Sequence, residues 1–468
     1  MMQKKIRYDR IGLEEVATSD WDKSVVSHGM HTKLPFSRFT MIDLFAGCGG
    51  LSLGMEQAGF TPVLFSELNL NAAETYMVNR RGEEIIPIGD IYSLTDANLA
   101  ILKSYWKQHR GISDIDLVCG GPPCQGFSGI GHRRTFALEK KDIPSNQLFQ
   151  EMARVIRVIR PKIFLFENVR GLLVSKWSAD GKSGEIFNEV LKEFSQIQGY
   201  AVKWELIHAK DYGVPQNRPR VLVVGIRHDV VNKPYAQMIF AAEGNGIENY
   251  NAIGKPVPTA VERGFLPSPV GCPPTMEELL SDLADMDYLG KAATLHYPSA
   301  PKSDVQRMLR TLPDGKVLGK GAPLTDQEYS NHSPTIRKKF EHMIANNGEI
   351  PEEMRTKKFA QRVLPRIWPP EGPNITACTL PEDYVHYSLP RGPTVREWAR
   401  IQMFPDWYVF TGARTTGGRR RAGDPSLGVW TRDVPRYTQI GNAVPVLLAR
   451  CVGEHFAKIL RGEVVPQL

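Results

Sequence analysis

Between residues 39 and 227, short and mostly apolar runs alternate with stretches whose apolar residues recur at every third or fourth position. The short runs are typical of buried strands, and the periodic stretches are typical of amphipathic helices. Strands that alternate with helices favour βαβ units and a parallel sheet, so the expected fold class is α/β. The strand-like runs are MIDLF, PVLFS, IDLVC, KIFLF and VLVVGI.

The stretch from 146 to 160 predicts a helix, because its apolar residues fall on one helical stripe. Pro161 cannot continue a helix and ends the stretch just before the next strand-like run. The stripe consists of Leu148, Phe149, Met152, Val155, Ile156 and Ile159.

The regular alternation stops near His228, and proline, glycine and polar residues dominate the chain from there to about residue 390. Short helices are expected at 275–286 and 337–346, and helical periodicity returns at 395–404 and 444–460. The chain therefore divides into an N-terminal extension, a first domain, a second and irregular domain, and a C-terminal segment that returns to the first. The boundaries are 1–36, 37–228, 229–434 and 435–468.

Composition excludes several classes of protein. No run of 18 or more apolar residues predicts a membrane span, and no secretory leader is recognisable. Six cysteines in 468 residues are too few for a disulfide scaffold, and their spacing suggests no zinc site, so we expect free thiols, a reducing cytoplasm and no metal. The net charge of +7 is compatible with a polyanionic partner.

The nonapeptide GGPPCQGFS, residues 120–128, presents Cys124 directly after the run IDLVC. Pro122 and Pro123 fix their own φ angles, while the flanking glycines let the chain bend sharply, so the thiol is expected on a stiff and exposed turn. Such a turn at a strand end suits a nucleophile. A lone cysteine is more often a small buried hydrophobe, which is how we interpret the other five. These are Cys48, Cys119, Cys272, Cys378 and Cys451.

A glycine-rich turn follows the first strand-like run, at Gly47, Gly49 and Gly50. Glycines there allow a tight turn that opens a helix, and they let a ligand approach the backbone closely. Ser52 stands where the dinucleotide fingerprint GxGxxG has its third glycine, so pyrophosphate binding is not favoured.

Two acidic residues follow the next two strands. Glu67 closes the run PVLFS and is suited to accept hydrogen bonds from ribose hydroxyls. Asp90 can accept from the exocyclic amine of an adenine, and Ile91 can pack on the ring. Each acid alone is more often a turn or cap residue, but with the glycine turn they indicate an adenosine-type cofactor.

Six motifs occur in the order and spacing found in the DNA (cytosine-5) methyltransferases, and the chain resembles that family over about 39–228 and from 391 onward. The motifs are DLFAGCGG, GPPCQGFS, FENVRG, QNRPR, RGPTVREWARIQMFP and YTQIGNAVP. The resemblance implies a Rossmann-like S-adenosylmethionine-dependent methyltransferase sheet with helices on both faces, plus a smaller irregular target-recognition domain. Residues 37–228 would then be the catalytic and cofactor-binding domain, and 229–434 the target-recognition domain.

The resemblance also implies an activity: sequence-specific methylation of cytosine C5 in duplex DNA. The target cytosine is flipped out, the Cys124 thiolate adds to C6, and C5 takes the methyl group of S-adenosyl-L-methionine, leaving S-adenosyl-L-homocysteine. Glu167 matches the glutamate that contacts N3 and the amino group of the base. Arg218 and Arg220 match the paired arginines near the base and the nucleophile.

Further positions carry over from the family. Asn168 ties a loop in place, and Arg396, Glu397 and Arg400 are scaffold. The expected DNA contacts are Gln125, Ser128, Arg133 and Arg134. The expected cofactor contacts are Phe45, Ala46, Gly47, Cys48, Gly49, Leu51, Glu67, Leu68, Asp90, Ile91, Pro123, Leu148, Asn442 and Val444.

The expected partner is double-stranded DNA, bound by a monomer in the cytoplasm of a prokaryotic host, with no membrane association. A separate cognate restriction endonuclease is compatible with this chain, and so is a solitary enzyme. The same chemistry on tRNA, a non-catalytic DNA-binding protein and a Rossmann oxidoreductase are the alternatives. Cys124, Glu167 and Arg218 disfavour the second alternative, and Ser52 disfavours the third.

Overall fold

The computed structural model describes residues 39–80, 85–123, 147–178, 180–231, 255–355, 361–366, 383–415 and 434–467. The expected N-terminal extension lies outside these ranges, as does Cys378. The segment 124–146 is also outside, and with it the predicted nucleophile Cys124 and the four predicted DNA contacts Gln125, Ser128, Arg133 and Arg134.

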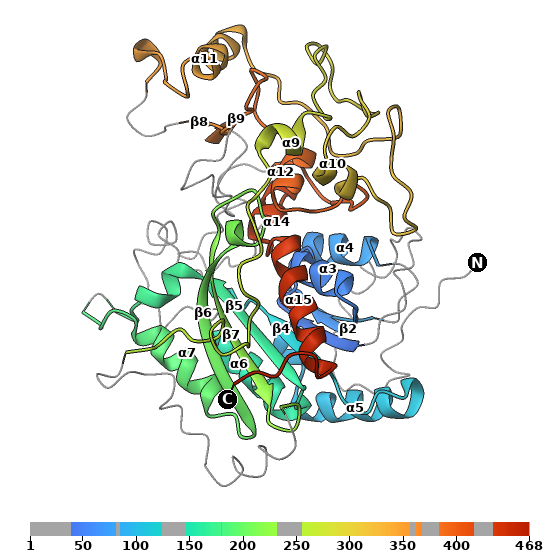
Figure 1. The fold of residues 1–468 in the computed structure, drawn as a ribbon, viewed down its shortest axis with the longest axis vertical. Helices are drawn as coiled ribbons and strands as arrows, with labels where there is room; N and C mark the ends of the chain where they lie inside the picture. The colour runs from blue at the N-terminus through green and yellow to red at the C-terminus, as the bar shows by residue number, and fades with distance from the viewer. Residues whose placement is uncertain are drawn as a thin grey trace.

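A seven-stranded sheet forms the centre of the first part of the chain, in the order β3-β2-β1-β4-β5-β7-β6 (Figure 1). Strands β1 to β5 are parallel, which confirms the α/β class with a Rossmann-like sheet. The strands are β1 (Phe39–Leu44), β2 (Phe60–Ser66), β3 (Ile86–Ile88), β4 (Leu117–Gly120), β5 (Ile163–Val169), β6 (Tyr200–His208) and β7 (Pro219–Arg227).

Strand β7 departs from the expected all-parallel sheet. It lies between β5 and β6 and is antiparallel to both. The connection from β6 to β7 spans only residues 209–218 and holds a single 3₁₀ turn, η6 (Ala209–Asp211). A parallel crossover needs a dozen or more residues, usually with a helix, so this short connection returns the chain as a hairpin.

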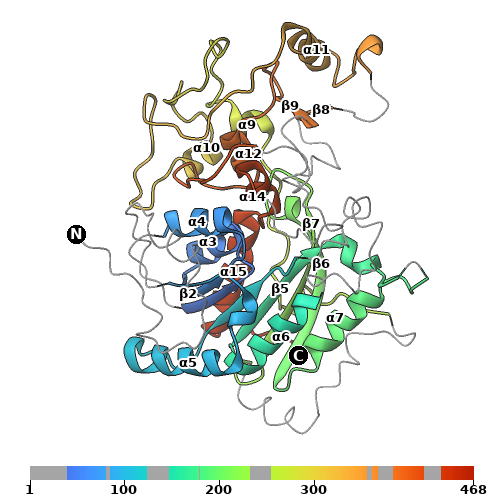
Figure 2. The ribbon, with the colours of Figure 1, turned by 180° about the vertical axis from the view of Figure 1, so that it is seen from behind.

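Helices cover both faces of the sheet, as predicted. In β1, Met41 faces one core cluster and Ile42 the other, which is the alternation of a strand buried on both sides. One face is covered by α5 (Asp96–Arg110), α6 (Leu148–Ile159) and α7 (Glu185–Ser195). The other is covered by α3 (Gly50–Gln57) and α15 (Val446–Leu460), and α15 crosses in front of the strands in Figure 1. Figure 2 shows α6 and α7 side by side from behind.

Helix α6 confirms the helix predicted at 146–160. Its buried residues include five of the six predicted for the stripe, and Leu148 at the first turn is half-buried. The helix ends at Ile159, the following residue Arg160 caps it with a left-handed φ of 58°, and β5 begins at Ile163. The five confirmed stripe residues are Phe149, Met152, Val155, Ile156 and Ile159.

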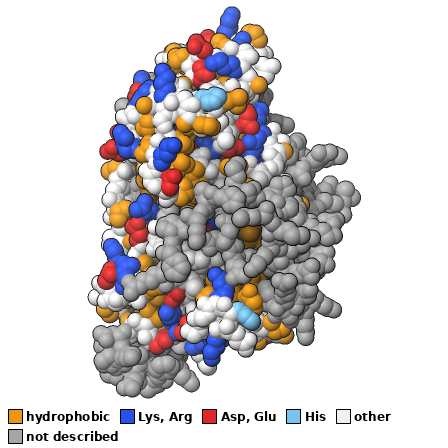
Figure 3. Space-filling model, turned by 90° about the vertical axis from the view of Figure 1, so that its right-hand side faces the viewer, with side chains coloured by type: hydrophobic (Ala, Val, Ile, Leu, Met, Phe, Trp, Pro, Cys, Tyr) orange, Lys and Arg blue, Asp and Glu red, His pale blue; other side chains and the backbone are white. Residues whose placement is uncertain are grey.

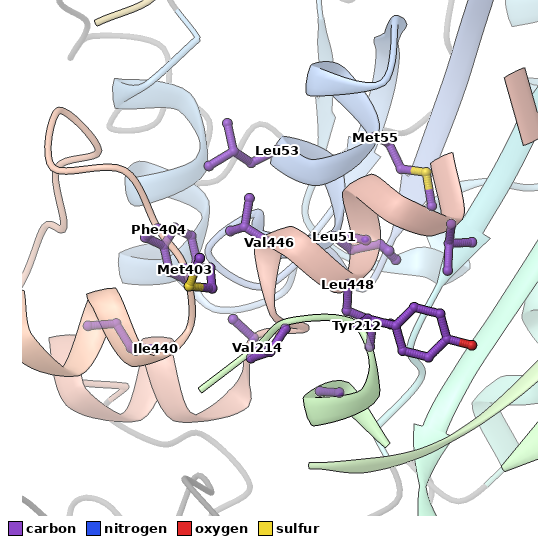
Figure 4. Close-up of a cluster of buried hydrophobic side chains, with 14 of the residues drawn as sticks. Leu51, Leu53, Met55, Tyr212, Val214, Met403, Phe404, Ile440, Val446 and Leu448 are labelled. Atoms are coloured by element: carbon purple, nitrogen blue, oxygen red, sulfur yellow. The ribbon is translucent and has the colours of Figure 1, made fainter. Parts of the chain in front are cut away.

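The C-terminal helix α15 packs tightly against α3. A Cβ atom on Gly54 of α3 would lie 2.4 Å from the Cβ of Ala449, and one on Gly453 of α15 would lie 2.8 Å from the Cβ of Ala58. Glycine at both positions thus lets the two backbones approach closely. Figure 4 shows part of the surrounding apolar cluster, which includes Leu51 and Met55 from α3 and Leu448 from α15.

The described residues between 255 and 415 are irregular, and they form short helices and one two-stranded pair. None of the helices in the described ranges is long and apolar enough to cross a membrane. Helix α9 is shorter than the stretch predicted at 275–286, and α11 begins a few residues before its predicted start. The elements are α9 (Met276–Leu280), α10 (Asp304–Leu309), α11 (Pro334–Ala345), β8 (Arg362–Val363), β9 (Tyr384–Val385), α12 (Val395–Ile401) and, further on, α14 (Arg436–Asn442).

Helix α12 carries a network of fully buried charges. Glu397 accepts hydrogen bonds from Arg391 at 2.8 and 2.6 Å. Arg400 pairs with Asp282 at 2.5 Å and with Asp406 at 2.6 Å. Each buried charge therefore has an opposite charge in contact, as buried ions require, and the network joins α12 to the segment around α9.

We expect Glu397→Gln to lower the free energy of unfolding by about 3 to 5 kcal/mol, because Arg391 would lose its buried counter-charge. Burial opposes ionisation of Glu397, but Arg391 outweighs it and lowers the pKa to about 2. A depressed folded-state pKa gives stability that is full above the unfolded value of about 4.3 and is lost as pH falls toward 2. Urea unfolding at pH 7 and at stepped pH values between 4.5 and about 2 measures both effects.

The matched control is Glu454→Gln on α15, whose partner Arg450 is 2.8 Å away in an exposed pair. That pair should contribute only about 0.5 kcal/mol or less. Equal losses in the two variants would show that burial of the Glu397 pair is not what makes it important.

Candidate active site

A strained turn joins β1 to α3. Gly47 and Gly49 have φ angles of 56° and 86°, and Phe45 has a φ of 58°, which is uncommon for a residue other than glycine. No heavy atom lies within 4 Å of the position that a Cβ atom on Gly47 would take. The backbone of this glycine turn, residues 45–50, is therefore open at Gly47 to a ligand.

Glu67 fixes the glycine turn to the end of β2. One of its carboxylate oxygens accepts from the Gly47 N–H at 2.8 Å, and the other accepts from the Asn69 N–H at 2.7 Å. Burial raises the pKa of Glu67, while the two amides act in the opposite direction. The side chain of Leu68, next along the chain, is 72% exposed. The carboxylate and an uncovered apolar side chain are thus neighbours at the turn.

Asp90 follows β3 and is exposed. Its side chain accepts from the Tyr92 N–H at 3.1 Å and so caps the 3₁₀ turn η1 (Ile91–Ser93). The side chain of Ile91 is buried in the core under this turn. Gly47, Glu67 and Asp90 therefore follow three neighbouring parallel strands, whose carboxyl ends share one edge of the sheet, where ligands bind in open α/β folds.

The Ser52 side chain forms hydrogen bonds in the core, which explains a serine at this position. Its hydroxyl donates to the buried carboxylate of Asp43 at 2.5 Å and lies 2.8 Å from the hydroxyl of Tyr76. Burial raises the pKa of Asp43 to about 7, and the Ser52 hydrogen bond partly offsets that rise. A glycine at position 52 would leave Asp43 without this donor.

A second cluster lies where β4 and β5 end and the antiparallel strand β7 begins. Glu167 of β5 and Arg220 of β7 form a buried ion pair. A Cβ atom on Gly121 would lie only 2.6 Å from a carboxylate oxygen of Glu167, so this carboxylate sits against the backbone of the turn after β4. The Asn168 side chain donates to the carbonyl oxygen of Pro122 at 3.2 Å. Glu167 and Asn168 together hold the turn that leads into Cys124.

Arg218 lies directly before β7 and connects this cluster to the C-terminal segment. Its guanidinium donates to the carbonyl oxygens of Gly441 and Asn442 at 2.8 and 3.1 Å. Burial lowers the pKa of Arg218, and the neighbouring Arg220 lowers it further. The carbonyl of Val444 closely approaches Gly50, where a Cβ atom would lie 2.5 Å from it. The GNAVP segment therefore lies between Arg218 and the glycine turn.

The other predicted cofactor residues divide into two groups. Pro123 and Asn442 are exposed, and Phe45, Leu148 and Val444 are half-buried. Leu51, Ala46 and Cys48 are buried, and Leu51 points into the apolar cluster of Figure 4. The Cys48 thiol donates to the Gln439 carbonyl at 3.4 Å, and burial raises its pKa to about 12.

Two residues that the sequence analysis missed contact the glycine turn. Arg80 donates to the Gly49 carbonyl and Tyr408 donates to the Cys48 carbonyl. Arg80 sits in the polar run NRRGEE, which gives no sign of burial. One cysteine interpretation was wrong: Cys272 is exposed, whereas Cys48 and Cys119 are buried as expected.

Figure 3 shows one face of the molecule, on which the described Lys and Arg side chains are interspersed with Asp and Glu. Short basic runs at 133–134 and 419–421 lie outside the described residues. A third basic run, at 337–339, lies on α11. On this face the described residues therefore do not form a continuous basic surface.

The fold defines a class, the Rossmann-like α/β proteins with a ligand site at the carboxyl edge of the sheet. A solved structure of a prophage-encoded protein assigned as a DNA modification methyltransferase (E. coli) shares the fold with a TM-score of 0.58 at 22% identity, covering 91% of this chain and all of that one. Residues 39–458 match the model of the C-5 cytosine-specific DNA methylase family, and the chain belongs to that family.

Among the relatives that match over most of the chain are two Type II methyltransferases. The Type II methyltransferase M.DdeI of Desulfomicrobium norvegicum is 31% identical over 433 residues, which cover 89% of this chain and 88% of that protein. The Type II methyltransferase M1.HphI of Haemophilus parahaemolyticus is 29% identical over 428 residues, covering 91% and 88%. The prediction from the motifs is confirmed: the protein is an enzyme that methylates cytosine C5 in DNA in a sequence-specific manner.

Proposed function

We propose that the enzyme transfers the methyl group of S-adenosyl-L-methionine to a cytosine flipped out of duplex DNA, with Cys124 as the nucleophile. The observation that carries this proposal is the buried Glu167–Arg220 pair, whose carboxylate lies against Gly121. Cys124 follows Gly121 by only three residues, and three Cα–Cα steps of about 3.8 Å limit how far apart the two can be. The thiol and the carboxylate can therefore reach the same pyrimidine.

The chemistry requires both groups, because C5 of cytosine is too weak a nucleophile to take a methyl group directly. Bond formation between the Cys124 sulfur and C6 makes C5 an enamine carbon, which can accept the methyl group. Loss of the C5 proton then lets the sulfur–C6 bond break. Glu167 would hydrogen-bond N3 and the amino group of the base and stabilise the adduct, while Arg220 holds Glu167 in place.

The residues at the strand edge fit an adenosyl cofactor. The open backbone at Gly47, the Glu67 carboxylate and the uncovered Leu68 side chain are the groups that such a ligand needs. When bound, S-adenosyl-L-methionine supplies an electrophilic methyl group on its sulfonium. Glu67 would accept from the ribose hydroxyls and Asp90 from the adenine amine, and the exposed Asn442 would close the site from the C-terminal side.

The remaining predictions concern DNA and partners. Gln125, Ser128, Arg133 and Arg134 are proposed to contact DNA behind the flipped base. Residues 229–434 are proposed as the target-recognition domain, and the irregular structure of the described parts of this range supports the proposal. Because the relatives are Type II methyltransferases, we also propose that a separate restriction endonuclease shares the recognition sequence. The enzyme would act as a monomer on the DNA of a prokaryotic cytoplasm.

Bisulfite sequencing tests the proposal. Duplex DNA incubated with the enzyme and S-adenosyl-L-methionine should show protected cytosines in a single sequence context. Omission of the cofactor should abolish protection, and tRNA added as a competing substrate should take up no methyl group. Methylation of tRNA with none on duplex DNA would overturn the assignment of the substrate.

A further inference from the structure

Arg80 and Tyr408 bind two consecutive carbonyl groups of the glycine turn. Tyr408 donates its hydroxyl to the Cys48 carbonyl at 2.5 Å, and an Arg80 guanidinium nitrogen donates to the Gly49 carbonyl at 3.2 Å. A second nitrogen of Arg80 donates to the Tyr408 hydroxyl at 3.0 Å. Both side chains are fully buried, so the contacts are shielded from water.

Arg80 is itself held rigidly. It forms an ion pair with Glu56 of α3 at 2.5 Å, and both side chains are almost completely buried. Its guanidinium stacks 3.8 Å from the centre of the Tyr76 ring and donates to the Tyr76 carbonyl at 2.8 Å. A Cβ atom on Gly49 would lie 2.8 Å from the guanidinium, so only glycine allows Arg80 this close to the turn.

Tyr408 belongs to a segment that is docked on α4 (Leu70–Val78) and on the residue after it. Val409 exchanges two hydrogen bonds of 2.9 Å with the Asn79 side chain, and the Thr411 N–H donates to the Thr75 hydroxyl at 2.9 Å. The carbonyl of Tyr408 accepts from Arg396 of α12 at 3.0 Å. The glycine turn is thus tied both to α4 and to the segment that follows α12.

We propose that Arg80 and Tyr408 are positioning residues that hold the glycine turn in its cofactor-binding conformation. Peptide units are planar, so fixing the Cys48 and Gly49 carbonyls also fixes the peptide planes that follow them. The turn contains three residues with left-handed φ angles, a conformation that persists only when its surroundings hold it. A site built from backbone binds tightly when its geometry is set before the ligand arrives. This inference rests on the proposed S-adenosyl-L-methionine site.

Tyr408→Phe tests the inference, because it removes one hydroxyl and leaves the ring packing. We expect the Kd for S-adenosyl-L-methionine, measured by calorimetry on the full chain, to rise about 5- to 10-fold. The KM for the cofactor should rise equally, while kcat at saturating cofactor and the Kd for duplex DNA stay within about twofold. Arg80→Lys, which keeps the charge but loses the fork of donors, should shift the same constants in the same direction.

Tyr212→Phe is the matched control, because the buried Tyr212 hydroxyl also donates to a backbone carbonyl, that of Pro267 at 2.8 Å. Its cofactor Kd should equal that of the wild type. Glu67→Ala separates the proposed cofactor site from the positioning role: if this variant binds the cofactor as tightly as the wild type, the proposed site is wrong. If Glu67→Ala weakens binding and Tyr408→Phe does not, or if Tyr408→Phe lowers thermal stability alone, the positioning role is refuted.

Discussion

Replacing Cys124 with serine is expected to abolish methyl transfer to DNA, with a loss in kcat on the order of 10³-fold or more. A thiol with a pKa of about 8.5 supplies a useful fraction of thiolate at neutral pH, whereas a serine hydroxyl supplies essentially no alkoxide. The Glu167–Arg220 pair and the Asn168 bond to Pro122 would remain in place, so the loss should be one of chemistry. Cofactor and DNA affinities should change little.

Duplex DNA carrying 5-fluorocytosine shows the nucleophile directly. Fluorine replaces the hydrogen at C5, so C5 has no proton to lose after methyl transfer and the sulfur–C6 bond cannot break. The enzyme therefore stays attached to the DNA on a denaturing gel. The wild type should form this adduct and Cys124→Ser should not. Cys272→Ser is the control, because Cys272 is the exposed cysteine among the described residues. If Cys124→Ser formed the adduct and Cys272→Ser did not, the nucleophile would be Cys272 and not Cys124.

Local patterns in the sequence predicted much of the fold. The stripe at 146–160 and Pro161 predicted α6 to within two residues, because helix periodicity and chain termination are local properties. The direction of β7 could not be predicted in this way. An apolar run has the same appearance in either direction, and only the short connection through η6 makes it antiparallel.

Motifs in the sequence point to residues that lie together in the candidate site, but they do not reveal partners that come from far along the chain. The glycine turn and Glu67 are 20 residues apart, and the structure joins them by a hydrogen bond. Arg218 bonds to carbonyls more than 200 residues away, and Tyr408 bonds to the carbonyl of Cys48 across a still longer separation. Such contacts depend on how α14 and the segment after α12 pack, which no local pattern records.

Glu167→Gln is expected to lower kcat by about 10²- to 10⁴-fold while the KM for S-adenosyl-L-methionine stays near the wild-type value. Glutamine has nearly the same shape and can still lie against Gly121, but it can neither carry the charge that Arg220 meets nor pass a proton to N3 of the base. Single-turnover rates with saturating DNA and cofactor would measure the chemical step itself. Unfolding in urea should be followed in parallel, because Arg220 would lose its buried counter-charge.

Asp116→Asn separates this chemical role from a loss of stability. Asp116 is also buried, just before β4, and pairs with Lys162 at 2.7 Å just before β5. The Asp116–Lys162 pair therefore lies where β4 and β5 begin, whereas Gly121 and Glu167 lie near the other ends of these strands. Asp116→Asn should destabilise the fold but leave the kcat of the folded enzyme unchanged. Glu167→Gln should lower the kcat of the folded enzyme, whatever its effect on stability. If both variants lose activity only in proportion to their unfolded fraction, Glu167 is a structural partner of Arg220 and does not act on the base.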